Sequence, residues 1–210
     1  MTPAEIVTAA RRKYNAENAG FYADSELYGL IYEAELQLIG EEYIVQDIDT
    51  SITTVSGTRT YSKPSLTVTI ERIEWNGEVL RKVDGFHVDD DLSAENPDTT
   101  STGTPRYWFE FADLIYLRPK PDAAQTLKLF RTKAPAAVTT ASQTLEIPVH
   151  FHRDITNYVA SEMAAKDENF QMAKFWGDKW EQSKLRFKSW AKRKKRAGGM
   201  ATVKSEEVYG

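Results

Sequence analysis

The sequence predicts an α+β protein in which helices from both ends of the chain form one bundle, with a small antiparallel β-domain inserted between them. Near both ends, apolar residues recur every three or four positions, which is typical of helices with one buried face. Between these regions, residues 43–133 are rich in Thr, Val, Ile and Tyr, and apolar residues alternate with polar ones, which is typical of strands. The last residues show no periodicity, so residues 197–210 are expected to form a flexible, extended tail.

The first of two helices expected within residues 1–42 starts at the very beginning of the chain. Thr2 is a good N-cap, Pro3 suits the first helical position, and the charge of Glu5 favours the positive end of the helix dipole. This helix is therefore expected to run to about Asn15.

A second helix is expected to begin at a cap formed by Asp24 or Ser25 and to end at about Ile39, with Gly40 as its C-terminal stop. Its apolar residues are spaced by three and four, so one side of the helix should be buried. The predicted buried residues are Leu27, Leu30, Ile31, Ala34 and Leu38.

The inserted β-domain is predicted to begin with short strands, indicated by Ile48, Ile52, Val55 and Tyr61. A longer strand is expected over Leu66–Trp75, because its residues alternate between apolar and polar types. The alternation predicts that three of its apolar residues share one side of the strand: Leu66, Val68 and Ile70.

Asn76-Gly77 predicts a two-residue hairpin turn, because both central positions of a type I′ turn need a positive φ. The return strand is expected over Glu78–Val83. A long polar loop is predicted over Asp89–Thr104, and two or three further strands are predicted between Arg106 and Thr132.

The C-terminal part of the chain is predicted to consist of a linker over residues 134–148 and two helices over residues 149–196. The first of these helices is expected from about Val149 to Ala165 and the second from about Phe170 to Arg196, with a turn at Asp167–Asn169 between them. The second helix has a predicted buried stripe of Ala173, Trp176, Trp180, Phe187, Trp190 and Ala191.

Composition excludes several kinds of chemistry. The 210 residues include no cysteine, which excludes disulfides, thiolate catalysis and cysteine-ligated metals. No apolar run approaches the roughly 18–20 residues that span a bilayer, and the N-terminus lacks the apolar core of a signal peptide. A soluble cytoplasmic product, without a membrane partner, is therefore expected.

Charge is distributed unevenly along the chain, although the net charge is only -4. Residues 1–150 carry 14 Lys and Arg against 23 Asp and Glu, whereas residues 151–210 carry 13 against 8. Most of the excess is in residues 182–196, which contain no acidic residue and eight basic ones: Lys184, Arg186, Lys188, Lys192, Arg193, Lys194, Lys195 and Arg196. Such a segment is typical of one that meets an acidic partner.

Two groups of residues invite a metal hypothesis. His150 and His152 are two positions apart, so they diverge on a helix, where metal-binding pairs usually sit four apart. Three consecutive aspartates, Asp89, Asp90 and Asp91, lack the alternating ligands and the glycine of a calcium loop. We therefore expect a helix start at the histidines and a solvated acidic loop at the aspartates, with no metal or cofactor.

The sequence also gives little support for catalysis. It has no Gly-x-Ser-x-Gly nucleophile motif and no glycine-rich phosphate loop. Carboxylates are plentiful, and a pair of them is enough to hydrolyse a glycoside, but no pair is singled out by its position. No catalytic residue is predicted.

An ordered series of short signatures identifies a resemblance. The order GTPRYW, IYLRPKPD, TLKLF and then LEIP-x-x-x-H-x-x-I, between Gly103 and Ile155, resembles the head-tail adaptor, or neck, proteins of tailed bacteriophages. The resemblance extends over about Ala4 to Trp190. The chain departs from the family pattern in the length of the loop before Gly103 and in the concentration of basic residues near its C-terminus.

This resemblance implies a structural virion protein, assembled in the host bacterial cytoplasm, that forms a ring of twelve subunits under the portal and surrounds the exiting duplex DNA. The implied partners are the portal ring, neighbouring adaptor subunits and a downstream tail or nozzle protein. The predicted portal-docking residues are Lys188, Lys192, Arg193, Lys194, Lys195, Arg196, Val203, Val208 and Tyr209. The predicted tail-facing or channel loops contain Asn76, Gly77, Asp89, Asp90 and Asp91.

Other interpretations remain open at this point. The basic run is also typical of a segment that binds DNA phosphates, or of a solvated helix end whose cations favour the negative pole of the helix dipole. A virion-associated hydrolase of the cell wall is a further alternative.

Overall fold

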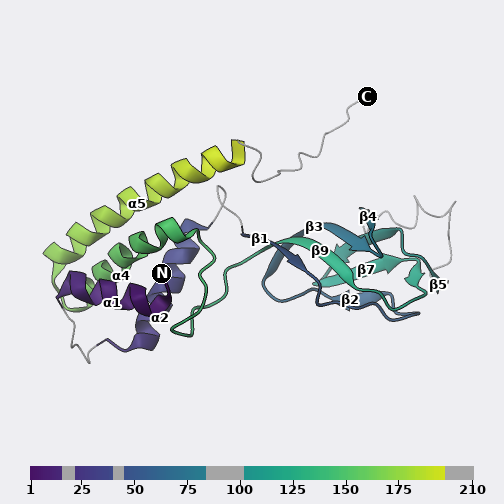
Figure 1. Ribbon diagram of the computed structural model, residues 1–210, viewed down its shortest axis with the longest axis horizontal. Helices are drawn as coiled ribbons and strands as arrows, with labels where there is room; N and C mark the ends of the chain where they lie inside the picture. Colours follow the sequence, from purple (N-terminus) through teal and green to yellow (C-terminus); the bar gives the residue numbers. More distant parts are fainter. Residues whose placement is uncertain (16–21, 40–44, 84–101, 197–210) are drawn as a thin grey trace. The chain divides into compact units, whose positions relative to one another are not determined.

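The computed structural model describes residues 1–15, 22–39, 45–83 and 102–196 (Figure 1). The chain divides into two compact units. A helical unit contains Met1–Val45 and the described residues from Pro135 onward, and a β unit contains Gln46–Ala134. The β unit is thus a single insertion between helices that belong to the same bundle.

The first helix, α1, spans Pro3–Tyr14, as the sequence predicts. The Thr2 hydroxyl accepts a hydrogen bond from the backbone N–H of Glu5, and the Glu5 carboxylate accepts one from the backbone N–H of Thr2 at 2.9 Å. This reciprocal capping box satisfies two of the backbone donors that a helix start leaves unpaired. At the other end, Asn15 adopts a left-handed conformation with φ 58°, which ends the helix.

The second helix, α2, spans Asp24–Leu38. The predicted cap is wrong: Ala23 occupies the N-cap position without a side-chain hydrogen bond, and Asp24 lies in the first turn. Asp24 instead accepts a hydrogen bond from Arg11 of α1 at 2.7 Å, so the carboxylate joins two helices. Four of the five predicted stripe residues are buried, and Leu30 is only partly buried.

The C-terminal helices confirm the predicted bundle. A 3-10 turn over Val149–Phe151, η1, leads into α4, which spans His152–Lys166, and α5 spans Phe170–Arg196. α4 is the central helix, because α1, α2 and α5 all pack against it (Figure 1). The large residues at the centre of this core are Ile6, Leu27, Ile31, Ile155, Val159, Met163, Trp180 and Phe187.

The segment before η1 contains no helix or strand but contributes to the helical core. Val138, Leu145 and Ile147 are buried among the helices. Their position is fixed by Glu35 of α2, whose Oε1 accepts hydrogen bonds from the backbone N–H groups of Glu146 at 2.7 Å and Ile147 at 3.3 Å. A buried carboxylate therefore pairs with backbone groups that have no partner in secondary structure.

Glu35 should make stability depend on pH. The side chain is 1% exposed, and burial raises its pKa from 4.5 to about 7, against the two backbone N–H donors that lower it. Because the folded-state pKa is the higher one, this contribution to stability is fully present below pH 4.5 and is lost as the pH rises through about 7. Between pH 5 and pH 8 we expect Glu35 to reduce the free energy of unfolding by about 2–3 kcal/mol.

Glu35→Gln tests this expectation, because glutamine keeps an acceptor oxygen but does not ionise. Urea unfolding at pH 5 and pH 8 should show that wild type loses about 2–3 kcal/mol more than the variant between the two pH values. Parallel pH dependence in the two proteins would contradict the raised pKa.

The β unit contains a curled, seven-stranded mixed sheet with the order β1-β9-β3-β4-β6-β7-β2, and a separate two-stranded sheet, β5-β8. The strands are β1 Val45–Asp49, β2 Thr60–Ser62, β3 Thr67–Trp75, β4 Glu78–Lys82, β5 Thr102–Gly103, β6 Tyr107–Phe111, β7 Leu114–Arg118, β8 Lys120–Pro121 and β9 Leu127–Lys133. The sheet encloses its own core, formed by Ile70, Ile73, Trp75, Leu80, Trp108, Ile115, Leu117, Leu127 and Leu129.

The predicted all-antiparallel pairing is wrong, because β4 pairs with β6 in parallel and β5 pairs with β8 in parallel. Parallel neighbours need a connection of about a dozen residues or more. The 24 residues between Lys82 and Tyr107 satisfy this requirement. The loop predicted over Asp89–Thr104 lies mostly outside the described residues, and Thr102–Gly103 at its end forms β5 instead.

The predicted alternation in β3 is also wrong at its start. Val68 is 59% exposed and Leu66 is 47% exposed, whereas Ile70, Ile73 and Trp75 are buried. Irregular pairing with β9 between Thr67 and Thr69 and between Ile70 and Arg72 explains the difference. Each bulge adds one residue to a strand and therefore reverses which side the following residues face.

The hairpin prediction is confirmed. β3 pairs with β4 through Trp75 and Glu78, and both turn residues have a positive φ, 49° at Asn76 and 82° at Gly77. No atom lies within 4 Å of a Cβ built on Gly77, so the backbone conformation alone requires glycine here.

Gly77→Ala is therefore expected to destabilise the protein by about 1–2 kcal/mol. Gly29→Ala in α2 is the matched control, because a Cβ there also meets no atom within 4 Å but the backbone is helical. That change should stabilise the protein by about 0.5–1 kcal/mol. Urea unfolding measures both values, and the same sign for the two changes would contradict the argument.

Candidate docking surfaces

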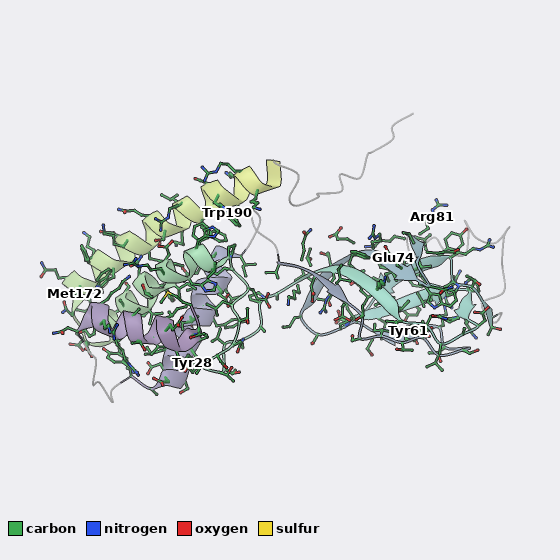
Figure 2. The ribbon with its side chains drawn as sticks, in the orientation of Figure 1. Tyr28, Tyr61, Glu74, Arg81, Met172 and Trp190 are labelled. Atoms are coloured by element: carbon green, nitrogen blue, oxygen red, sulfur yellow. The ribbon has the colours of Figure 1, made fainter. Side chains whose placement is uncertain are left out.

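The C-terminal end of α5 extends past the helix on which it packs. α5 has 27 residues and α4 has 15, which correspond to lengths of about 40 Å and about 22 Å. Aromatic contacts with η1 continue the packing, because the Phe151 ring lies 4.8 Å from the Phe187 ring and 5.4 Å from the Trp190 ring. Trp190, labelled in Figure 2, is only partly buried, and Ala191 is the last buried residue among the described side chains of α5.

Beyond Ala191 the helix has no described core contact. Lys194 lies seven residues after Phe187 and therefore on the same side of the helix, yet Lys194 is exposed. Lys188, Lys192 and Arg193 are exposed as well. We call these four exposed cations, Lys188, Lys192, Arg193 and Lys194, the basic end. Lys195 and Arg196 complete the helix, but their side chains lie outside the described residues, as do Val203, Val208 and Tyr209.

The structure divides the basic run of the sequence into two parts. Lys184 pairs with Glu181 at 2.6 Å, and Arg186 pairs with Asp154 of α4 at 2.5 Å. In contrast, no carboxylate of the described residues forms an ion pair with Lys188, Arg193 or Lys194. The early members of the run therefore pair with carboxylates of α4 and α5, whereas the side chains of the basic end are exposed.

Of the other predicted contact residues, the structure describes only the two in the β3–β4 hairpin. Asn76 and Gly77 are exposed at the tip of the β3–β4 hairpin. Asp89, Asp90 and Asp91 lie outside the described residues. The basic end and the hairpin tip thus belong to different units.

His150 of η1 and His152, the first residue of α4, have structural contacts. His152 is 6% exposed, and its ring nitrogens lie 2.8 Å from the carbonyl oxygen of Ile147 and 2.9 Å from that of Met1. The His150 ring instead packs against the Trp190 ring at 5.3 Å. Within the described residues, no group of three or more His, Cys, Asp or Glu side chains is placed to hold a metal ion.

A partly buried lysine, Lys13, also joins helices of the bundle, and the sequence analysis did not single it out. The Lys13 Nζ donates hydrogen bonds to Thr156 Oγ1 and Asn157 Oδ1, both at 2.5 Å, and lies 4.8 Å from the centre of the Trp176 ring. Burial and then the positive charge of Arg153 lower the Lys13 pKa to about 8. In the sequence, Lys13 looks like any basic residue near the C-terminus of a helix. Only the tertiary structure shows that it contacts α4 and α5.

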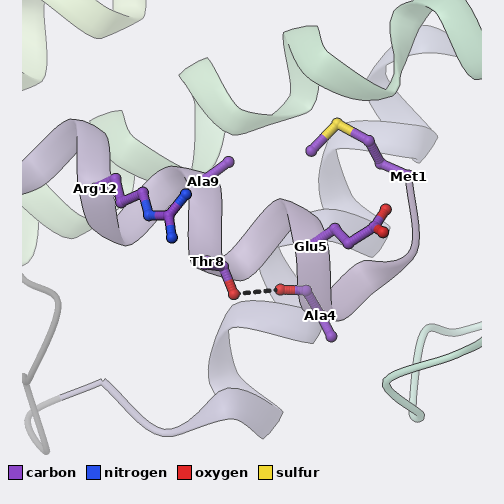
Figure 3. Close-up of a pocket in the computed structure, with 6 residues that line it drawn as sticks. All are labelled: Met1, Ala4, Glu5, Thr8, Ala9 and Arg12. Atoms are coloured by element: carbon purple, nitrogen blue, oxygen red, sulfur yellow. Dashed lines mark hydrogen bonds between the residues drawn. The ribbon is translucent and has the colours of Figure 1, made fainter.

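A second surface feature absent from the sequence analysis is a hollow of about 440 Å³ on the outer side of α1 (Figure 3). It is lined by Met1, Ala4, Glu5, Thr8, Ala9 and Arg12. The sequence contains one indication of this hollow. Ala4 and Thr8 are small residues four positions apart, so they lie next to each other on the helix surface and leave a depression between longer side chains.

The chain was compared with known proteins and protein families. No curated protein matches it. Among the described helices, none is both long and apolar enough to cross a membrane. Residues 1–203 match the family described as SU10 adaptor protein, a phage head-tail adaptor family whose members are structural components of the virion. Since this match covers nearly the whole chain, the protein belongs to the SU10 adaptor protein family.

Proposed function

We propose that this adaptor docks on the portal ring through the basic end of α5 and the residues that follow it, and forms a ring of twelve copies there. Duplex DNA passes through the centre of this ring to the tail. The family supports the head-tail connection. The observation that carries the docking site is the exposed basic end, whose cations extend past α4.

Helix ends with clustered, exposed cations bind acidic surfaces well. Lys192, Arg193 and Lys194 follow one another within a single turn, so they repel one another until a negative surface approaches. An acidic rim on the portal supplies this charge and steers the adaptor to it. Residues 203–209 add the apolar anchors Val203, Val208 and Tyr209, which contact the portal next to the cations.

The β unit contacts the next component of the tail in this proposal. The hairpin tip at Asn76 and Gly77 is exposed and closed by a rigid type I′ turn, which suits a fixed contact point. The acidic run Asp89–Asp91 lies near the DNA, where its charge repels phosphates and keeps the duplex from binding tightly.

Light scattering on the purified protein, alone and mixed with the portal ring, tests the proposal. A monomer or weak oligomer alone should become about one adaptor per portal subunit in the mixture. Removal of Lys192–Gly210 should abolish this binding while leaving the helical circular dichroism signal of the bundle in place. An adaptor that stays monomeric beside the portal would overturn the proposal.

The same purified protein can be used to test whether the basic end binds the portal or duplex DNA. Binding of the basic end to duplex DNA would depend steeply on salt, because phosphate contacts release counterions. We expect no complex with a short duplex at about 0.15 M salt, where the complex with the portal persists. Tight DNA binding without portal binding would assign the basic end to nucleic acid.

A further inference from the structure

The hollow on α1 faces away from the core of the bundle. Its lining residues are on the side of α1 opposite Ile6, Val7 and Ala10, which pack inward. Thr8 is one of the lining residues, and its hydroxyl donates a hydrogen bond to the Ala4 carbonyl oxygen at 2.9 Å, so this polar group is satisfied by its own helix (Figure 3). The hollow can therefore accept an apolar side chain without leaving that hydroxyl unpaired.

A projecting leucine lies on a different helix of the same unit. Leu185 of α5 is 65% exposed, and between Trp180 and Arg196 it is the one large apolar residue that is exposed among the described side chains of this helix. Glu181 lies four residues before it and Lys188 three residues after it, so the three side chains form one row on the helix surface. We call Glu181, Leu185 and Lys188 the α5 ridge. In this inference Lys188 serves the contact between copies, and Lys192, Arg193 and Lys194 of the basic end remain for the portal.

The charges of the hollow and the ridge are complementary, and the two carboxylates would share them with their present contacts, since Glu181 pairs with Lys184 at 2.6 Å and Glu5 accepts the Thr2 backbone N–H. Glu5 and Arg12 are seven residues apart on α1, and Lys188 and Glu181 are seven residues apart on α5, so each pair spans about 10 Å. When the two helices lie antiparallel, Lys188 meets Glu5, Glu181 meets Arg12, and Leu185 lies between them over Thr8. The two charged pairs have the same spacing, and each charge meets one of opposite sign only in this antiparallel alignment. The charges therefore specify both the register and the direction of the helix contact.

The two surfaces cannot meet within one copy. α1 and α5 each pack their inner faces on α4, whereas the hollow and the ridge are on the outer faces of these helices. A contact between them therefore joins two chains. Because it uses different surfaces on its two sides, it is heterologous, and repetition of such a contact generates a ring when the rotation closes.

We propose that the α5 ridge of one copy packs into the α1 hollow of the next copy, with Leu185 over Thr8 and Lys188 beside Glu5. This inference rests on the proposed ring and identifies the contact that repeats around it. A single leucine and two charged pairs make a weak contact, which agrees with assembly only where the portal collects many copies.

Cysteine cross-linking tests the contact directly, because the chain has no native cysteine and any disulfide must join introduced residues. Thr8→Cys and Leu185→Cys are made in separate proteins, mixed with and without the portal, and oxidised gently. Both positions are exposed, so the fold should tolerate the changes. The mixture should give disulfide-linked dimers at least about tenfold faster than either variant alone, because only the mixture places the two sulfurs side by side.

The matched control is Leu36→Cys, another exposed leucine of the same unit at 44% exposure, mixed with Thr8→Cys. This mixture should cross-link only at the rate of random collision. A chain that carries both Thr8→Cys and Leu185→Cys should give a ladder of multimers on a non-reducing gel. Equal rates in the test and control mixtures, or faster dimers from one variant alone, would overturn the inference.

Failure of this inference and failure of the proposed function give different results. If the wild-type protein binds the portal but the Thr8→Cys and Leu185→Cys mixture does not cross-link on it, the ridge and hollow are not the ring contact, and the adaptor proposal stands. If the mixture cross-links but the wild-type protein does not bind the portal, the contact between copies stands and portal docking fails.

Discussion

Phe187→Ala is expected to destabilise the helical unit by about 3–5 kcal/mol, the largest effect on stability of any change considered for this protein. Phe187 is 1% exposed, and its ring lies 4.8 Å from the Phe151 ring and 5.7 Å from the Trp190 ring. Removal of the ring leaves a cavity at the point where η1, α4 and α5 meet, and its aromatic neighbours are too rigid to fill it. Urea unfolding followed by circular dichroism at the helix wavelength measures the loss.

Two controls separate cavity formation from a general effect of substitution in α5. Phe187→Leu keeps most of the volume and should cost no more than about 1.5 kcal/mol. Phe170→Ala removes the same ring from the same helix, but Phe170 is 74% exposed, so the change should lie within about 0.5 kcal/mol of wild type. A similar loss for Phe170→Ala and Phe187→Ala would contradict the assignment of Phe187 to the core.

Reversal of the three cations at the end of α5 is expected to weaken portal binding by on the order of 100-fold or more. The triple variant Lys192→Glu, Arg193→Glu and Lys194→Glu replaces attraction to an acidic surface by repulsion. It also places three negative charges at the negative pole of the helix dipole, which frays the last turn. Lys188 is left unchanged, so that the α5 ridge stays intact. Sedimentation of the adaptor with the portal ring measures the affinity.

A control variant changes the net charge of the protein by the same amount through three substitutions outside the basic end. Arg81→Glu, Lys128→Glu and Lys174→Glu alter three exposed residues that do not belong to the basic end. This control should bind the portal within about threefold of wild type, because it leaves every cation of the proposed docking site in place. Equal loss in both triple variants would indicate that overall charge, and not the basic end, governs binding.

The local features of the fold could be read from the sequence because their causes are close together in the chain. Thr2, Pro3 and Glu5 specify the start of α1 within one turn, and Asn76-Gly77 specifies the β3–β4 hairpin with two residues. Spacing alone predicts half of the buried stripe of α5 correctly, since Trp180, Phe187 and Ala191 are buried. The other three predicted residues, Ala173, Trp176 and Trp190, are only partly buried. The basic run was visible too, because eight cations without an acidic residue stand out in any window.

The errors arise where pairing partners are far apart in the sequence. The parallel pairing of β4 and β6 depends on how 24 intervening residues return across the sheet, and the bulges of β3 depend on its register with β9. Neither the parallel pairing nor the bulges can be recognised from the spacing of apolar residues in the sequence. The split of the basic run has the same origin, because Asp154, which pairs with Arg186, belongs to another helix.

By itself, then, the sequence determined the four helices, the hairpin, the presence of a basic C-terminal segment and the adaptor family. Only the tertiary structure decided that Glu35 holds the backbone of Glu146 and Ile147, that the sheet is mixed, and that Leu185 projects while the face of α1 is hollow. The physical reason is the range of the interactions. Capping, turns and amphipathic spacing act over a few residues, whereas burial of a carboxylate, strand register and surface shape depend on which distant segments pack together.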